Sequence, residues 1–129
     1  MLPTPGMDHD YRITGLVIGC AIEVHKVLGP GLKESSYQKA LCEVLSDRSI
    51  KFEAQRRLQV SFKGTPVGQY QPDLIVENLV VVELKSVERL IPLFTSQVVS
   101  YLKVTGLRVG LILNFNCAKM TDGIKRVVL

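Results

Sequence analysis

Tryptophan is absent from this chain of 129 residues, and cysteine is scarce. The three cysteines, Cys20, Cys42 and Cys117, lie far apart and form no CxxC pair. An odd, scattered set argues against a disulfide framework and against a zinc knuckle, and it favours reduced thiols in the cytoplasm. Without tryptophan or a series of aromatic residues, the sequence gives no support to binding of single strands by base stacking.

Long apolar runs are missing as well. The run ITGLVIGCAI covers only residues 13–22, whereas a membrane span needs about 20 apolar residues. We therefore interpret it as part of a buried helix and expect no contact with a membrane. The first ten residues, MLPTPGMDHD, contain neither a basic n-region nor an apolar h-region, so no signal peptide is expected.

The composition fits one globular domain. Hydrophobic residues make up 47% of the chain, which is enough to fill a core. No repeat or low-complexity tract marks a boundary, so we expect residues 1–10 to form a flexible arm and residues 11–129 to form a single domain. The net charge of +4 permits a polyanionic partner such as DNA or RNA but does not require one.

Hydrophobic periodicity and turn signals predict the order of the elements. Helices are expected over residues 11–28, 32–48 and 92–106, the last beginning with Pro92 and ending at Gly106. Strands are expected over residues 51–55, 58–62, 68–77, 80–86 and 108–115, with a turn over 63–68 and a last short strand in the tail. This α, α, β, β, β, β, α, β order predicts an α/β fold in which helices cover the faces of a mixed sheet.

The stretch PDLIVENLVVVELK, residues 72–85, places charged residues inside an apolar hairpin. A two-residue loop would pair Asp73 with Val82, whereas a three-residue loop over residues 77–79 pairs Asp73 with Glu83. Only the second register gathers one wholly aliphatic face, and burial selects that register. That face consists of Leu74, Val76, Val80, Val82 and Leu84.

In this register Asp73 and Glu83 point the same way, with Cβ atoms about 5 Å apart. Two like charges directly opposite each other destabilise a sheet, so something must offset the repulsion. Lys85, one step along the same face, could neutralise one carboxylate, and a divalent cation would neutralise both. Hard oxygen ligands suit Mg²⁺ or Mn²⁺. The alternative is an exposed hairpin face that carries an ion pair.

Two motifs carry a resemblance to known proteins. Pro72-Asp73 followed by Glu83-Leu84-Lys85 resembles the signature of the PD-(D/E)XK nuclease superfamily. GPGLKESSY, residues 29–37, resembles the motif of the prokaryotic GxxExxY family within that superfamily, and similar flanking segments extend the resemblance over about residues 13–128. The resemblance implies a restriction-endonuclease-like core, α-β-β-β-α-β, with an extra N-terminal helix.

The resemblance also implies a metal site. Asp73 and Glu83 would hold Mg²⁺ with the help of the backbone carbonyl of Leu84, and Glu34 resembles the helix-borne acid that completes many such sites. Lys85 would orient or help to deprotonate the attacking water and stabilise the developing charge. For Glu34 the alternative is an acid in a first helical turn, which the helix dipole favours.

Gln97 and Tyr101 lie four residues apart on one face of the predicted third helix. They resemble the QxxxY element of recombination-type nucleases, which implies a catalytic role. The alternative is an ordinary helix flank. For His25 we favour a packed or capping histidine, and for Tyr37 a core aromatic residue with a tethered hydroxyl.

Basic residues recur along the chain and could form a phosphate track. They could equally be a solvated face. They are Arg56, Arg57, Lys63, Lys103, Lys119, Lys125 and Arg126.

Two functions remain open at this point. The first is a metal-dependent nuclease that hydrolyses phosphodiester bonds in DNA or RNA. The second is a nucleic-acid-binding or protein-interaction module that keeps the fold without turnover, because a fold does not fix a function. The chain offers little beyond a minimal core, so specificity would come from a homodimer or from an unknown protein partner.

Overall fold

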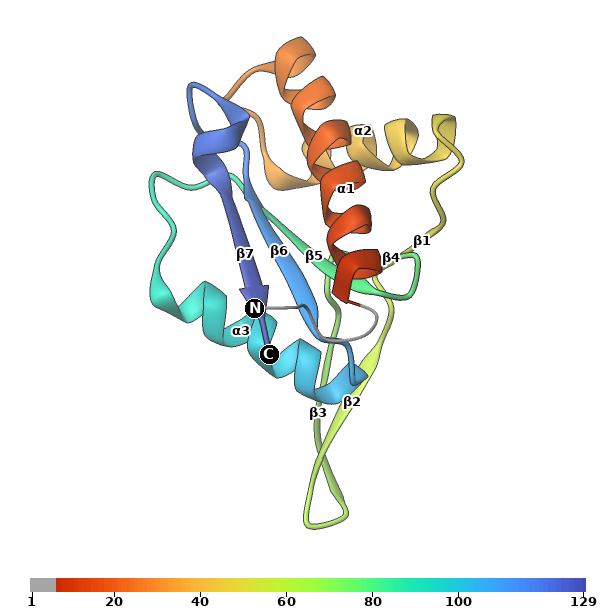
Figure 1. Cartoon of the computed structure of the whole chain (residues 1–129). Coiled ribbons are helices and arrows are strands. Elements are labelled where there is room, and N and C mark those ends of the chain that lie inside the picture. Colours follow the sequence, from red (N-terminus) through yellow and green to blue (C-terminus); the bar gives the residue numbers. More distant parts are fainter. Residues whose placement is uncertain (1–6) are drawn as a thin grey trace.

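A computed structural model describes residues 7–129, with only the backbone described for residues 7 and 8. Three helices and a five-stranded sheet form the body of the molecule, and a two-stranded hairpin projects from it (Figure 1). The helices are α1 (Met7–Leu28), α2 (Glu34–Asp47) and α3 (Pro92–Thr105). The strands are β1 (Phe52–Ala54), β2 (Leu58–Phe62), β3 (Thr65–Tyr70), β4 (Leu74–Val76), β5 (Val80–Lys85), β6 (Val109–Asn114) and β7 (Ile124–Val128), and a short 3₁₀ turn, η1 (Met120–Gly123), precedes β7.

The sheet is mixed, as predicted. Its strand order is β1-β4-β5-β6-β7, and only β5 and β6 run parallel, because α3 connects them as a crossover. Buried residues of α1 and α2 pack on one face of the sheet, and those of α3 pack on the other. The architecture is therefore the expected α/β layering of a restriction-endonuclease-like fold.

Local sequence sets the limits of α3. Pro92 occupies its first turn, where a missing N–H costs no hydrogen bond. The helix ends at Gly106, which has a φ of 75° and donates its N–H to the carbonyl of Leu102 at 2.9 Å. Both ends agree with the sequence-based prediction, so the face that α3 turns toward the sheet is fixed.

The register of the β4–β5 hairpin is the predicted one. Leu74 pairs with Val82 and Val76 pairs with Val80, across a loop of residues 77–79. The predicted aliphatic face packs under α1 and α2, whereas Ile75 faces α3. One step before Leu74, Asp73 therefore stands opposite Glu83 on the α3 side of the sheet.

The prediction of a single strand over residues 68–77 is wrong. The chain forms β3 and β4 there, and these strands belong to different sheets. Pro72, which has no N–H to donate, lies in the break between them. The turn expected over residues 63–68 is also shorter. Lys63 and Gly64 form it alone, with φ values of 50° and 79°.

The N-terminal region differs from the expected arm of residues 1–10. Residues 1–6 lie outside the described part of the chain, but α1 begins at Met7. Asp10 is buried in this first part of the helix and forms an ion pair with Arg108 at 3.0 Å, which ties α1 to the start of β6. Within residues 7–129, no helix is long and apolar enough to cross a membrane.

Candidate active site

Asp73 and Glu83 lie at the point where the pairing of β4 with β5 ends, and the carboxylate of each accepts a hydrogen bond from the facing chain segment. The backbone N–H of Asp73 donates to Oε1 of Glu83 at 2.8 Å, and the N–H of Leu84 donates to Oδ2 of Asp73 at 2.8 Å. Pairing of β4 with β5 stops at Leu74. The two carboxylates thus accept hydrogen bonds from main-chain groups beyond the ladder, which fixes both side chains.

Burial makes this pair electrostatically costly. Glu83 is 5% exposed, and its pKa rises from 4.5 to about 7, first because of burial and then because of the neighbouring charge of Asp73. Burial also raises the pKa of Asp73, although the N–H of Leu84 opposes that rise. Two carboxylates that share a desolvated site favour uptake of a proton or of a cation near neutral pH.

The donor set fits a hard divalent cation. The N–H and C=O of one strand residue point to the same side of the strand, so the carbonyl of Leu84, like its N–H, points to the side of β5 on which Asp73 lies. Two carboxylates and a carbonyl are oxygen ligands of the kind that Mg²⁺ prefers, and Mg²⁺ usually keeps several waters. Among residues 7–129, however, no three His, Cys, Asp or Glu side chains gather closely enough to hold a metal together.

Glu34 is the exposed first residue of α2, one residue after the cap residue Lys33. Its charge raises the pKa of both Asp73 and Glu83, so its carboxylate acts on the pair. It does not complete a preformed cage of three acids. Glu34 thus lies within electrostatic range of the pair without joining it as a third gathered ligand.

The sequence-based prediction of the site did not include two glutamines, Gln38 and Gln55, that lie next to the pair. The amide of Gln38, four residues after Glu34, donates to the carbonyl of Asp73 at 3.4 Å. The amide of Gln55 donates to Oδ1 of Asp73 at 3.5 Å and to Oε1 of Gln38 at 3.3 Å. The i, i+4 spacing of Glu34 and Gln38 was a usable signal, because it places both on one helix face.

Lys85 shares the face of the carboxylates but forms no ion pair with them. Its Nζ lies 4.3 Å from the centroid of the Phe94 ring on α3, and none of the ion pairs within the described chain includes it. Its charge still lowers the pKa of Asp73 and of Glu83. An exposed face with a direct ion pair is therefore excluded, and Phe94 is a neighbour that the sequence did not reveal.

The structure places Gln97 and Tyr101 on the same side of the sheet as the carboxylate pair. Tyr101 is 6% exposed, and its pKa is raised first by burial and then by the charges of Glu83 and Asp73. A side-chain hydrogen bond with the exposed Gln97 opposes this rise. Tyr101 thus packs on the face of the sheet that carries the carboxylate pair, with Gln97 beside it.

Tyr37 secures the loop before α2, as predicted for a tethered core residue. Its hydroxyl donates to the carbonyl of Gly29 at 2.5 Å and accepts from the N–H of Leu32 at 3.1 Å, while its ring stacks on Phe115 at 4.4 Å. The hydroxyl of Ser86 donates to the carbonyl of Leu32 at 2.6 Å. The loop that leads to Glu34 is therefore fastened both to α2 and to the end of β5.

His25 is likewise structural. It is 8% exposed, and its Nε2–H donates to the carbonyl of Cys117 at 2.8 Å. This contact ties α1 to the segment after β6, as expected for a packed or capping histidine.

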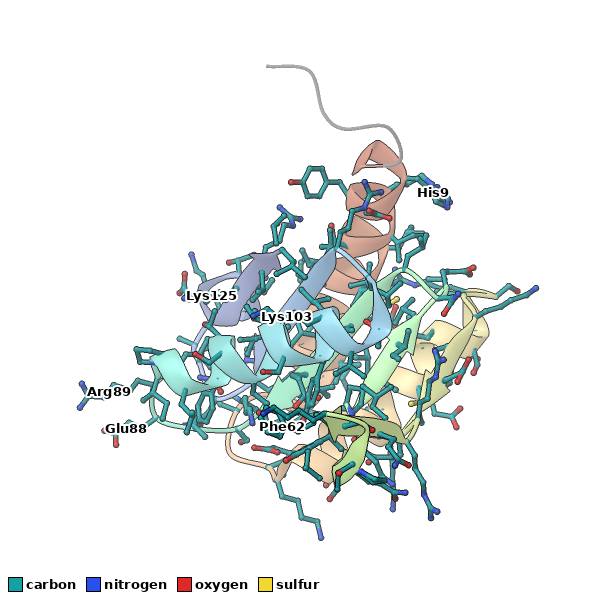
Figure 2. The ribbon with its side chains drawn as sticks, turned by 90° about the horizontal axis from the view of Figure 1, so that it is seen from below. His9, Phe62, Glu88, Arg89, Lys103 and Lys125 are labelled. Atoms are coloured by element: carbon teal, nitrogen blue, oxygen red, sulfur yellow. The ribbon has the colours of Figure 1, made fainter. Side chains whose placement is uncertain are left out.

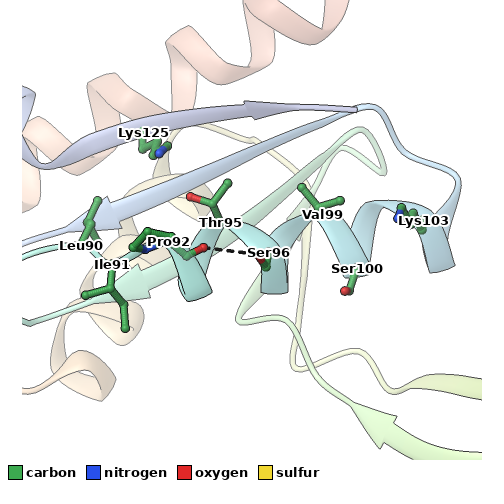
Figure 3. A pocket seen from close by; sticks show the side chains of 9 residues that line it. All are labelled: Leu90, Ile91, Pro92, Thr95, Ser96, Val99, Ser100, Lys103 and Lys125. Atoms are coloured by element: carbon green, nitrogen blue, oxygen red, sulfur yellow. Dashed lines mark hydrogen bonds between the residues drawn. The ribbon is translucent and has the colours of Figure 1, made fainter.

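The basic residues do not form one track. The guanidinium of Arg126 lies 5.1 Å from the Tyr11 ring and donates to the hydroxyl of Thr14, so it is engaged at α1. Lys103 and Lys125 border one large cavity of about 620 Å³ along the outer side of α3 (Figure 3). Figure 2 shows both amines on that side of the molecule. This cavity contains hydroxyls and amines but no acid.

A sequence model of the PD-(D/E)XK nuclease superfamily matches residues 11–127. The chain belongs to this superfamily. Searches among curated proteins and among solved structures found no match. PD-(D/E)XK nucleases typically use divalent metals, in agreement with the oxygen donors at the Asp73–Glu83 pair.

Proposed function

We propose that this PD-(D/E)XK protein is a Mg²⁺- or Mn²⁺-dependent nuclease that hydrolyses phosphodiester bonds in DNA or RNA. The observation that carries the proposal is the pair of Asp73 and Glu83, which main-chain hydrogen bonds hold together. Glu83 is buried and Asp73 is half-buried on the α3 side of the sheet, and no ion pair of the described residues includes either of them. A structural role alone would favour amides or apolar residues here, because two desolvated acids destabilise the fold.

Asp73, Glu83 and the carbonyl of Leu84 would hold the metal, with Glu34 acting on it from the start of α2. When bound, the metal supplies a nucleophilic water at neutral pH and polarises the scissile phosphate. Gln38 and Gln55 keep Asp73 oriented through their amides. The chain thereby presents its carboxylates in a fixed geometry before substrate arrives.

Lys85 would stabilise negative charge at the scissile phosphate and orient the attacking water. Its contact with Phe94 holds the ammonium beside the carboxylates rather than on them, so the amine keeps hydrogens to donate. Gln97 and Tyr101 would position the phosphate from α3 through their amide and hydroxyl. A donor aimed at developing charge typically contributes about 10²–10³-fold in rate.

Three finer assignments belong to the same proposal. Gly31, Glu34 and Tyr37 support membership of the GxxExxY branch, since Tyr37 fastens the loop that presents Glu34. The three cysteines are free, in keeping with a cytoplasmic location. The minimal core leaves room for a homodimer or a protein partner to contribute specificity.

A non-catalytic binding module is the second candidate. The observation that favours it is that, among the described residues, no third acid gathers with Asp73 and Glu83 to hold a metal. Such a module would bind nucleic acid through its basic residues and leave the phosphodiester bond intact.

A cleavage assay separates the two candidates. Plasmid, branched and single-stranded DNA, with RNA counterparts, are incubated with the protein in Mg²⁺, in Mn²⁺ and in EDTA. The proposed function predicts metal-dependent cleavage that Asp73→Asn abolishes and that Glu88→Gln, a change of an exposed acid, leaves intact. Figure 2 shows Glu88 at the edge of the molecule. Binding without cleavage in every metal would instead support the module.

A further inference from the structure

A second cavity lies between the projecting hairpin and α3. Its volume is about 260 Å³. Leu58, Val60 and Tyr70 of the hairpin line one side, and Gln97, Tyr101 and Val104 of α3 line the other. The hairpin pairs only with itself, so its strands are not needed to complete the main sheet.

This cavity adjoins the candidate active site. Gln97 and Tyr101 line it, and Tyr101 packs in one buried cluster with Ile75 and Val81, which lie two residues from Asp73 and Glu83 on the same face of the sheet. Tyr101 thus connects the cavity to the face that carries the carboxylate pair. If the phosphate of a nucleotide lies at the carboxylate pair, the adjoining part of the strand would extend toward this cavity.

Tyr70 offers an aromatic surface inside the cavity. Its ring lies over Gly68, where a Cβ would stand only 3.0–3.3 Å from the ring atoms and hydroxyl. Glycine therefore leaves the space that the ring occupies along the hairpin. The side chain remains 47% exposed, so the ring has a surface open for stacking.

We propose that this cavity binds one unpaired nucleobase of the substrate strand, beside the scissile phosphate at the carboxylate pair. The inference rests on the proposed function for that phosphate. It extends the function to a substrate class, namely strands with an unpaired or extruded base, because a base in an intact duplex cannot enter.

The chemistry of the walls supports this occupant. A dry cavity of about 150 Å³ accepts a benzene ring, so 260 Å³ accommodates a larger planar heterocycle. Aromatic rings stack on any base. Exposed Arg56, Arg57 and Lys63 lie on or beside the hairpin, where flanking phosphates would run.

The fold, rather than the sequence, creates this aromatic site. Tyr70 and Tyr101 are far apart in the chain, and the sequence contains no series of aromatic residues. Docking of the hairpin on α3 brings the two rings to one cavity.

Fluorescence of 2-aminopurine tests the proposal, and the absence of tryptophan keeps the background low. A single-stranded oligonucleotide carries the probe at each position in turn, and binding is measured with Ca²⁺ in place of Mg²⁺ to limit turnover. We expect strong quenching at one position. Tyr70→Ala should abolish that quenching and weaken binding by about 10- to 100-fold.

Matched variants separate stacking from folding. Tyr70→Phe keeps the ring and should bind like the parent protein. Gly68→Ala should push the ring by a few tenths of an ångström and cause a smaller loss than Tyr70→Ala. Val67→Ala, at an exposed position on the same hairpin outside the cavity lining, is the control and should change nothing. Thermal melts verify that each variant is folded.

An abasic residue at the quenched position gives the sharpest comparison. It should weaken binding to the parent protein as much as Tyr70→Ala does and have no further effect in that variant. No quenched position in the parent, or an equal loss in Val67→Ala, would overturn the proposal. So would a change in sedimentation on Tyr70→Ala without loss of quenching, because a second copy of the chain would then fill the cavity.

The two proposals fail in different ways. If a base is quenched in the cavity but no strand is cut in Mg²⁺ or Mn²⁺, the nuclease proposal fails and the base site stands. If strands are cut but Tyr70→Ala binds and cuts them as the parent does, the base site fails and the nuclease stands.

Discussion

The backbone N–H of Asp73 lies 2.8 Å from Oε1 of Glu83, and the side chain of Asp73 in turn accepts a hydrogen bond from the residue after Glu83. This reciprocal arrangement holds two acids together on the α3 side of the sheet. The pKa values of both are raised, first by burial, so the pair favours uptake of a proton or of a cation.

Metal-free stability should fall as pH rises from about 4.5 to 7. Because the pKa of Glu83 is raised to about 7 in the folded state, the folded protein binds more protons than the unfolded chain over this range, and stability decreases with pH. The effect at Glu83 is roughly 3 kcal/mol, and the raised pKa of Asp73 acts in the same direction. Thermal melts in EDTA between pH 4.5 and 8.5 measure it.

Glu83→Gln should flatten that pH profile and raise the melting temperature at pH 8, since the amide carries no charge to desolvate. Glu88→Gln, a change of an exposed acid, should keep the slope of the parent protein. A parent whose stability rises between pH 5 and 7 would contradict the account of the pair.

Asp73→Asn should stabilise the metal-free protein and abolish stabilisation by metal. The asparagine carbonyl can still accept the N–H of Leu84, while the repulsion and one ligand charge are lost. In the parent, Mn²⁺ at a hundredfold excess over its Kd should add about 2.7 kcal/mol. Melting curves with and without Mn²⁺ check both effects, and an unchanged metal shift in Asp73→Asn would refute the role of this side chain.

Lys85→Met should separate metal binding from chemistry. It leaves both carboxylates, so Mn²⁺ should bind at least as tightly once the neighbouring cation is gone. Cleavage should fall by about 10²–10⁴-fold. Loss of metal binding in this variant would show that Lys85 acts on the site's structure instead.

Phe94→Leu offers a milder form of the same test. The leucine keeps an apolar contact but removes the ring face that holds Nζ of Lys85. We expect an intermediate loss of cleavage with unchanged Mn²⁺ affinity, measured as initial rates under saturating metal. A rate equal to that of the parent would mean that the cation–π contact does not position Lys85.

Tyr37→Phe should destabilise the fold by about 1–3 kcal/mol, because the N–H of Leu32 then loses its partner. The loop that presents Glu34 would loosen, so cleavage should fall more than Mn²⁺ binding. Urea unfolding gives the first value and a cleavage assay the second. A stability equal to that of the parent would show that water replaces the hydroxyl without cost.

Much of the fold could be predicted from the alternation and burial of apolar residues alone. The register of β4 and β5 follows from the aliphatic set on one face, because a one-residue slip would expose it. Pro72 lies at the break between β3 and β4, but the predicted strand over residues 68–77 ran through it. The helical start at Met7 depends on long-range contacts such as Asp10 with Arg108, which local periodicity does not contain.

The residues around the carboxylate pair were harder to predict from the sequence. Gln55 reaches Asp73 from a turn 18 residues earlier, at a position with a φ of 56°, and Phe94 meets Lys85 only because α3 crosses over the sheet. The cavity beside Tyr101 likewise needs the hairpin to dock on α3. Such contacts join segments whose spacing in the chain carries no periodic signal.

The most direct test of the central claim is an anomalous diffraction map of crystals soaked in Mn²⁺. The account predicts one strong peak about 2.1 Å from carboxylate oxygens of both Asp73 and Glu83, with the carbonyl of Leu84 among its ligands. Absence of a peak between these carboxylates at millimolar Mn²⁺, or occupancy only at other acids, would contradict the metal site and with it the proposed nuclease.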